Sequence, residues 1–112
     1  MKILLTGIIL SILSTSSYAD LASYYGRGFH GKKTASGEVF NQYAMTAASN
    51  SHKMGTKLKV TNVATGKSVI VKINDTGAFT RKYGRTLDLS QGAFASIAPL
   101  SQGICKVKIE RL

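Results

Sequence analysis

The sequence predicts a small, mainly β domain in the form of a barrel or sandwich, with one short helix. Short β-branched and apolar runs recur along the chain, glycine-rich segments separate them, and a single stretch carries a helix start signal. The chain of 112 residues contains one cysteine, so no internal disulfide can form and the fold must rest on packing. The sequence shows no heptad, internal repeat or low-complexity linker, which indicates one domain.

The most distinct predicted element is a β-hairpin. Residues 57–63 alternate between polar and apolar side chains, 64–67 form a turn, and 68–73 return as a second strand. We expect further strands at 22–25, 44–48, 86–89 and 104–109. Ser90 is expected to cap a helix over 91–98 that Pro99 closes. Cys105 shares its strand face with apolar residues, which predicts a buried, unreactive thiol.

Residues 1–19 have the pattern of a secretory signal peptide. Lys2 supplies a positive start, the stretch from Ile3 to Leu13 is almost wholly apolar, and Ser17-Tyr18-Ala19 fits a cleavage site. The apolar stretch is shorter than the roughly 20 residues that a membrane-spanning helix needs. No cysteine stands directly after the cleavage site, so no lipid anchor is expected. The sequence therefore predicts an exported domain, residues 20–112, in the periplasm or cell envelope.

The charge of the chain is strongly positive. It has 15 Lys and Arg against 5 Asp and Glu, a net charge of +10 at pH 7. For an exported protein, this charge favours an anionic surface such as cell-wall polymer, acidic glycan or membrane headgroups, and export argues against nucleic acid. The alternative is that the charge only keeps the protein soluble.

The stretch from Val69 to Ser90 contains the main candidate for chemistry. An apolar strand ends at Asn74-Asp75-Thr76-Gly77, so a carboxylate is held at the end of a stiff element beside a glycine. Asp75 is either a reactive group or a turn residue that caps its own backbone. A second acid, Glu38, lies in another loop of glycine and hydroxyl residues, and such a pair suits general acid–base work on a glycosidic bond.

Two other features of the sequence argue for structural roles or against further chemistry. Asp88 lies between two leucines, and we interpret it as a structural carboxylate. His30 and His52 stand in no metal-ligand pattern, so neither a metal nor another cofactor is expected.

Several segments taken together resemble the RlpA family of septal lytic transglycosylases. They are Ala22-Ser23-Tyr24-Tyr25-Gly26, Phe29 to Glu38, Thr46-Ala47-Ala48, Gly55-Thr56, Ile73-Asn74-Asp75 and Gly84 to Ser90. The resemblance covers the chain from about residue 20 onward and implies a six-stranded double-psi β-barrel, as in barwin-like proteins and expansins. It also implies an exported enzyme that cleaves peptidoglycan glycan strands lacking stem peptides, leaving 1,6-anhydromuramic acid ends.

The resemblance assigns roles at the site residue by residue. Asp75 matches the family's catalytic aspartate and Glu38 its active-site glutamate. The family has a histidine directly after Thr-Ala-Ala, where this chain has Ser49, with His52 three residues later. Ser49, His52 and Asn74 are therefore candidate supporting residues. The missing histidine also supports an alternative, a non-catalytic glycan-binding module comparable to expansins.

Further residues are candidates for substrate contact. The aromatic side chains could either stack on sugars or fill the core. The basic side chains could contact the lactyl carboxylates of muramic acid or simply be solvated. The hydroxyl groups could bind sugar or order their own loops. These residues are Tyr25, Phe29, Lys33, Thr34, Ser36, Phe79 and Arg85. A monomer is expected, with cell-division or cell-wall proteins as candidate partners besides the glycan.

Overall fold

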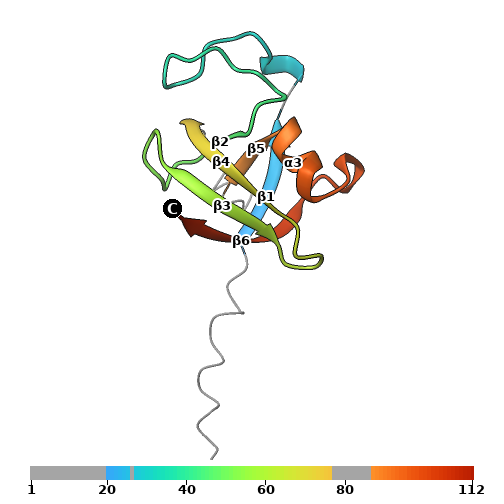
Figure 1. Ribbon diagram of the computed structural model, residues 1–112. Coiled ribbons are helices and arrows are strands. Elements are labelled where there is room, and N and C mark those ends of the chain that lie inside the picture. The colour runs from blue at the N-terminus through green and yellow to red at the C-terminus, as the bar shows by residue number, and fades with distance from the viewer. Residues whose placement is uncertain (1–19, 26, 77–86) are drawn as a thin grey trace, which may run out of the picture.

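The computed structural model describes residues 20–25, 27–76 and 87–112, whose six strands close into a barrel (Figure 1). The strands are β1 (Asp20–Tyr25), β2 (Thr46–Ala48), β3 (Lys57–Asn62), β4 (Ser68–Asp75), β5 (Leu87–Ser90) and β6 (Cys105–Arg111). The helical elements among these residues are α3 (Gln91–Ile97) and two 3-10 turns, η3 (Arg27–Phe29) and η4 (Leu100–Gln102). The predicted mainly β class and the six-stranded barrel with one short helix are confirmed.

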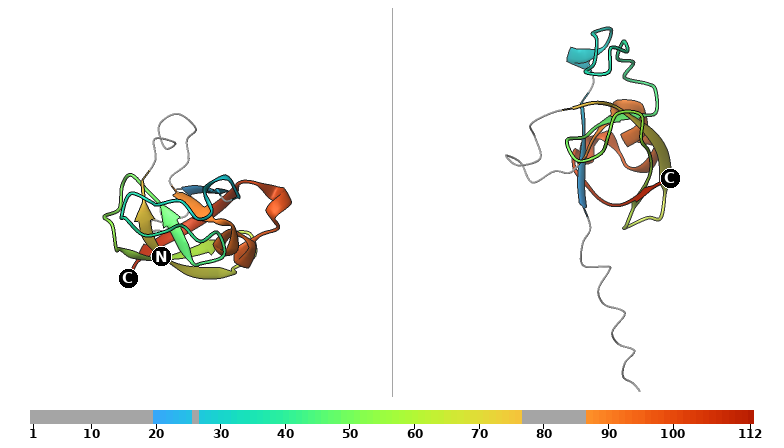
Figure 2. Two further views of the ribbon diagram at one scale, coloured as in Figure 1. Left: turned by 90° about the horizontal axis from the view of Figure 1, so that it is seen from above. Right: turned by 90° about the vertical axis from the view of Figure 1, so that its left-hand side faces the viewer.

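The strands follow the order β1-β5-β2-β4-β3-β6 around the barrel. Two neighbouring pairs are parallel, β1 with β5 and β2 with β4, and the other four are antiparallel. Parallel neighbours need a crossover instead of a hairpin, so long connections must run past the ends of the barrel. Residues 27–45 connect β1 to β2, which lie on either side of β5, and this connection lies over one end of the barrel (Figures 1 and 2).

The core fills the barrel with the inward-facing side chains of its strands. Leu58 and Val60 of β3 belong to this core together with Val71 and Ile73 of β4, and Leu58 pairs directly with Val71. On β3 these buried residues alternate with exposed lysines, which is why the hairpin could be predicted from the sequence. Phe94 of α3 packs into the same cluster. The remaining members of the core are Ala22, Ala47, Leu87, Leu89, Ala93, Ile97, Ala98, Cys105 and Val107, which confirms the buried position predicted for Cys105.

Local signals of the sequence also define how the elements begin and end. Gly66 adopts a positive φ of 81° in the turn of the β3–β4 hairpin, where a side chain would be strained. Ser90 is the N-cap of α3, and its hydroxyl accepts the backbone N–H of Ala93 at 3.1 Å. The helix ends at Ile97, one residue earlier than predicted, and Ala98 is its C-cap.

Three predictions fall on residues outside the described ranges. They concern the leader of residues 1–19, and Phe79 and Arg85 between β4 and β5. Within the described residues, none of the helices has the length and apolar character needed to cross a bilayer.

Candidate active site

An irregularity in β4 decides which way Asp75 faces. Lys72 and Ile73 pair with Thr46 and Ala47 of β2, but Ala48 pairs with Asp75, so Asn74 is an extra residue in the ladder. In regular pairing Asp75 would share the inner face of Ile73, because side chains alternate along a strand. The bulge at Asn74 instead gives Asp75 the outer face that Lys72 occupies. Asp75 is half-buried there, at the last position of β4.

The same outer face carries a second aspartate. Ala48 pairs with Asp75 on one side and with Asp88 of β5 on the other, and Asp88 pairs in turn with Ser23 of β1. Two strand spacings separate the aspartates, so their Cα atoms lie about 10 Å apart across Ala48. The Ser23 hydroxyl donates to Asp88 Oδ1 at 2.9 Å, as a structural role requires. Asp75, Ala48 and Asp88 therefore lie side by side on three neighbouring strands, a row that we call the rung of Asp75. The sequence interpretation did not predict this position of Asp88.

Glu38 is carried by a tight turn within the 27–45 connection. The N–H of Gly37 donates to the Thr34 carbonyl at 2.9 Å, and Gly37 has a positive φ of 92°. The Thr34 hydroxyl donates to the Glu38 carbonyl at 3.0 Å, and Ser36 Oγ accepts the Glu38 N–H at 3.3 Å. Thr34 and Ser36 were expected either to bind sugar or to order their loop, and these contacts order the loop.

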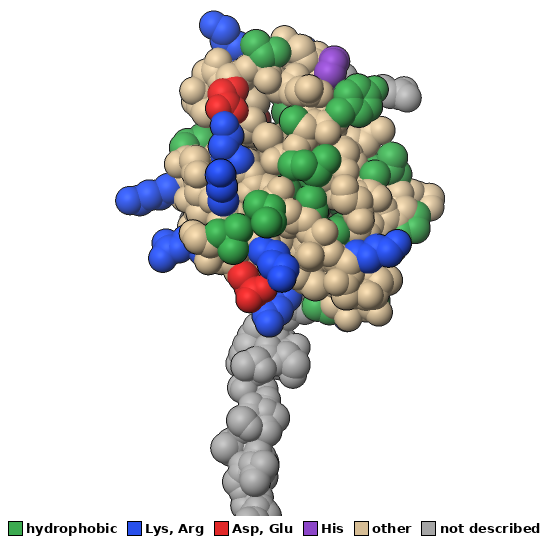
Figure 3. Space-filling model, viewed as in Figure 1, with side chains coloured by type: hydrophobic (Ala, Val, Ile, Leu, Met, Phe, Trp, Pro, Cys, Tyr) green, Lys and Arg blue, Asp and Glu red, His purple; other side chains and the backbone are tan. Residues whose placement is uncertain are grey.

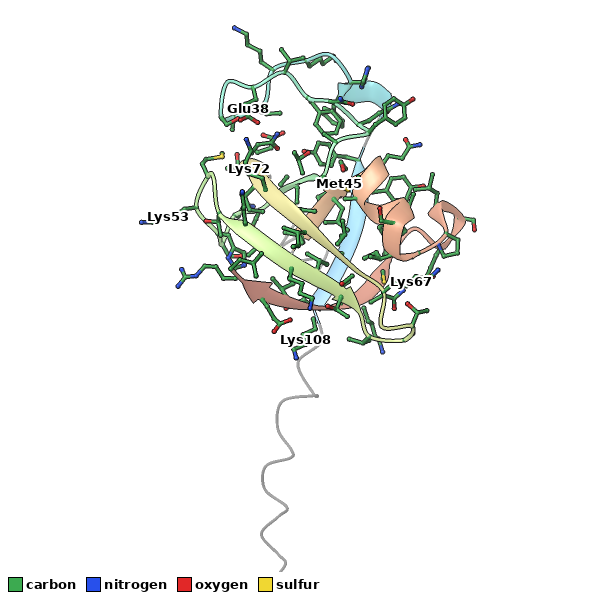
Figure 4. The ribbon with its side chains drawn as sticks, in the orientation of Figure 1. Glu38, Met45, Lys53, Lys67, Lys72 and Lys108 are labelled. Atoms are coloured by element: carbon green, nitrogen blue, oxygen red, sulfur yellow. The ribbon has the colours of Figure 1, made fainter. Side chains whose placement is uncertain are left out.

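Two side chains of β4 bind the carboxylate of Glu38 (Figure 4). Lys72 Nζ lies 2.6 Å from Oε2, and Asn74 Nδ2 donates to Oε1 at 3.1 Å. These two hydrogen bonds, with that from Lys72 the larger influence, lower the pKa of Glu38 below its ordinary value. Glu38 is therefore held as an anion, although its side chain stays 45% exposed.

The turn that carries Glu38 is also tied to Asp75. The N–H of Ala35 donates to Asp75 Oδ1 at 3.0 Å, and the N–H of Thr76 donates to the same oxygen at 2.9 Å. The N–H of Ser36 donates to the Asn74 carbonyl at 3.3 Å. The end of β4 thus holds both predicted carboxylates in one assembly, Asp75 directly and Glu38 through Lys72 and Asn74.

Ser49 and His52 lie in the loop that follows β2. The N–H of Ser49 donates to the Asp75 carbonyl at 3.0 Å, so its backbone supports the site. Its hydroxyl is buried and accepts the N–H groups of Ser51 and His52 at 3.0 and 3.2 Å. The Ser49 side chain, where the resemblance implies a histidine, is thus engaged in its own turn, and the His52 side chain is half-buried.

An aromatic cluster covers the β1 side of the site. The ring of Tyr25 stacks on buried Phe40, with centroids 4.5 Å apart, and meets exposed Phe29 edge-on at 5.5 Å. The Tyr25 hydroxyl is buried without a hydrogen-bond partner among the described residues. Burial first, and then the charges of Asp75 and Asp88, raise the pKa of Tyr25, so the phenol keeps its proton and can only act as a neutral group near both aspartates.

The structure adds site residues that sequence reasoning missed. Lys72 and Asp88 occupy outward positions of strands whose inward neighbours are apolar, and this alternation was the available signal for both. Elsewhere on the 27–45 connection, Tyr43 is 63% exposed with its ring against His30. Lys33 is exposed on the same connection, at an isolated bridge to Val39.

Basic side chains dominate the surface next to Glu38. In Figure 3 lysine and arginine side chains gather over β3 and β4 on the face below the 27–45 connection. Opposite Lys72 in the register lies Lys57 of β3, and both are at least partly exposed. No group of three or more His, Cys, Asp or Glu side chains suited to a metal ion occurs in the part of the chain that the structure describes.

Comparison with known proteins places this chain in a family. The sequence profile of the family described as "Lytic transglycolase" matches residues 17–109. The chain is 51% identical over 90 residues to the "Probable endolytic peptidoglycan transglycosylase RlpA" of Synechocystis sp., covering 80% of this chain and 27% of that protein. It is 44% identical over 101 residues to the "Endolytic peptidoglycan transglycosylase RlpA" of Campylobacter jejuni, covering 89% and 36%.

A solved structure shares the fold. The Streptomyces papain inhibitor, a double-psi β-barrel protein, superposes with a TM-score of 0.61 at 23% identity, covering 84% of this chain and 94% of its own. The chain spans about a quarter to a third of the two RlpA relatives, so it corresponds to one part of each. The profile match across the barrel and the identity to both relatives show that the chain belongs to the RlpA-like lytic transglycolase family of double-psi β-barrels.

Proposed function

We propose that this chain is an endolytic lytic transglycosylase domain that cleaves peptidoglycan glycan strands lacking stem peptides. Family membership and the names of the two relatives support the reaction class. The observation that carries the proposal is the bulge at Asn74, because it brings Asp75 to the outer face beside the turn that holds Glu38. Neither the comparisons nor the geometry of the site adds support to the non-catalytic module that Ser49 suggested.

Asp75 is the proposed proton carrier. Among the described residues, the hydrogen bonds to its carboxylate both fall on Oδ1, from the N–H groups of Ala35 and Thr76. An oxygen that accepts two N–H groups is poorly suited to hold a proton, so we assign the transferred proton to Oδ2. Half-burial at the end of a rigid strand keeps this oxygen in a fixed position for a bound sugar.

The proposed reaction replaces the bond from C1 to the bridging oxygen by a bond from C1 to the 6-oxygen of the same sugar, and it consumes no water. Protonated Asp75 gives its proton to the bridging O4 oxygen as the bond from that oxygen to the anomeric C1 of muramic acid breaks. The 6-hydroxyl of the same muramic acid then attacks C1, and its proton returns to Asp75. The products are a free 4-hydroxyl on the leaving sugar and a 1,6-anhydro ring, and Asp75 is regenerated.

Glu38 takes an electrostatic part in this scheme. Positive charge develops on C1 and the ring oxygen as the glycosidic bond breaks. An anion whose orientation is already fixed by Lys72 and Asn74 can stabilise that charge without rearranging during the reaction. The lowered pKa of Glu38 suits this role better than that of a proton donor.

We place the protein in the periplasm or cell envelope, exported by the leader of residues 1–19 and acting as a monomer on peptidoglycan glycan. Cell-wall or cell-division proteins are further candidate partners. The excess of basic residues complements stripped strands, because removal of a stem peptide frees one lactyl carboxylate on each muramic acid.

The test is product analysis with matched variants. The purified protein and its Asp75→Asn variant are incubated with sacculi that an amidase has stripped of stem peptides, and mass spectrometry follows 1,6-anhydro products. Glu110→Gln is the control, since Glu110 is an exposed acid on β6. We expect release by the wild type and by Glu110→Gln, and none by Asp75→Asn. Binding to sacculi with no anhydro product from any protein would reject catalysis and leave the glycan-binding module.

A further inference from the structure

Lys72 occupies an unusual position in the barrel. It lies directly opposite Lys57 of β3, and like charges opposite each other across two strands are destabilising. The carboxylate of Glu38, which reaches Lys72 from a loop 34 residues away, offsets this repulsion at a distance of 2.6 Å. Barrel stability alone does not explain a lysine here.

Lys72 lies on the face where Asp75 emerges. Lys72 and Asp75 pair with Thr46 and Ala48 of β2, two residues apart on that strand, so their side chains share a face. Lys72 and Asn74 each hold one oxygen of Glu38, which fixes both the position and the rotation of the carboxylate. Of these two donors only Lys72 carries a charge.

We propose that Lys72 is a positioning residue of the transglycosylase site, which acts on the reaction through Glu38. It anchors the Glu38 carboxylate above β4, keeps it ionised, and so presents a fixed negative charge on the face that carries Asp75. This inference rests on the proposed function. It adds a residue whose loss weakens the chemical step while glycan binding is largely kept.

The charges around Glu38 give the proposal a pH signature. Of the groups that face Glu38 from β4, Lys72 is charged and Asn74 is neutral, while Asp75 faces the neighbouring part of the turn through Ala35. Lys33, on the same loop as Glu38, forms an isolated bridge with Val39, the residue that follows Glu38. Lys72 is the main cause of the lowered pKa of Glu38, so its removal moves that pKa upward. If ionised Glu38 is needed, the acid limb of activity then moves to higher pH.

The experiment compares Lys72→Met with Lys72→Arg and with Lys57→Met as a matched control. Lys57 is the cross-strand neighbour, so its replacement removes the same charge from the same strand pair without touching Glu38. On stripped glycan we expect Lys72→Met to lower kcat about tenfold to a hundredfold, as for a misplaced active-site group, with a smaller change in KM. Lys72→Arg should recover most of the rate because a guanidinium also pairs with carboxylates. Lys57→Met should keep kcat near that of the wild type.

A second readout separates this proposal from the proposed function. Glu38 and Glu110 are the two glutamates of the chain, so carboxyl-labelled glutamate gives two NMR signals to follow during a pH titration. We expect the Glu38 midpoint to rise in Lys72→Met and to stay in place in Lys57→Met. Equal kcat in Lys72→Met and Lys57→Met, or an unchanged Glu38 midpoint, would overturn the role of Lys72. A wild type that titrates as expected but releases no anhydro product would instead reject the proposed function.

Discussion

Ser90 joins two parts of the domain through one buried hydroxyl. Its Oγ accepts the N–H of Ala93 and so caps α3, and it donates to the carbonyl of Ala44 in the connection that leads into β2. The side chain is fully buried, so water cannot replace either partner. We predict that Ser90→Ala destabilises the protein without any change in the reactive groups.

The size of this effect follows from the two contacts. Replacing a serine N-cap by alanine costs about 1 kcal/mol. The Ala44 carbonyl also accepts the N–H of Thr46 at 3.0 Å, so it keeps one partner, and we add about 1 kcal/mol for the lost hydrogen bond. A total of about 2 kcal/mol corresponds to a fall in melting temperature of about 10 °C for a domain of this size.

Thermal unfolding followed by circular dichroism measures the change. Ser96→Ala is the matched control, since Ser96 lies on the same helix but is exposed, with its hydroxyl donating to the Gly92 carbonyl. We expect that control to stay within about 0.5 kcal/mol of the wild type. If Ser90→Ala melted at the same temperature as Ser96→Ala, the buried hydroxyl would not contribute in the way that its contacts indicate.

Two further predictions concern the connection that carries Glu38. A Cβ at Gly92 would lie 2.5 Å from the Tyr43 carbonyl oxygen, so Gly92→Ala should lower the free energy of unfolding in urea by about 1–3 kcal/mol. Gly28→Ala is the control and should be tolerated, because a Cβ there meets nothing within 4 Å. Equal effects of the two substitutions would contradict the close approach at Gly92. The lowered pKa of Glu38 means that its ionised form stabilises the fold above the unfolded pKa, near 4.5, and that this contribution is lost as the pH falls through the folded value. Glu38→Gln should therefore be less stable than the wild type at neutral pH and should approach it in acid, and a constant difference across the acid range would count against the ion pair.

The sequence predicted the barrel's elements because their signals are local. Alternation along 57–63 and 68–73, the turn between them and the serine before 91 each depend on residues close in the chain, and the structure confirms them. The closed six-stranded barrel came from the family resemblance, since its two parallel pairs join segments that no local pattern connects.

The site was only partly predictable, because its contacts are non-local. Glu38 and Asp75 were chosen from their loops and the resemblance, but the ion pair to Lys72 joins residues 34 positions apart. Asp88 was interpreted as structural, and its hydrogen bond to Ser23 agrees, but its place on the rung of Asp75 depends on a register that only the folded barrel defines. Tyr25 was expected to touch sugar or fill the core, and its ring stacks on Phe40, a residue without a role in the sequence interpretation.

The extra residue in β4 reconciles two demands on one strand. Val71 and Ile73 must face inward to build the core, and strict alternation would then direct Asp75 inward as well. A carboxylate among these apolar side chains would cost several kcal/mol or lose its charge, and no glycan could reach it. With Asn74 inserted, Asp75 returns to the outer face, while Asn74 itself stays buried and donates to Glu38. The irregularity that interrupts the ladder is therefore the feature that lets a core strand also carry the proposed reactive group.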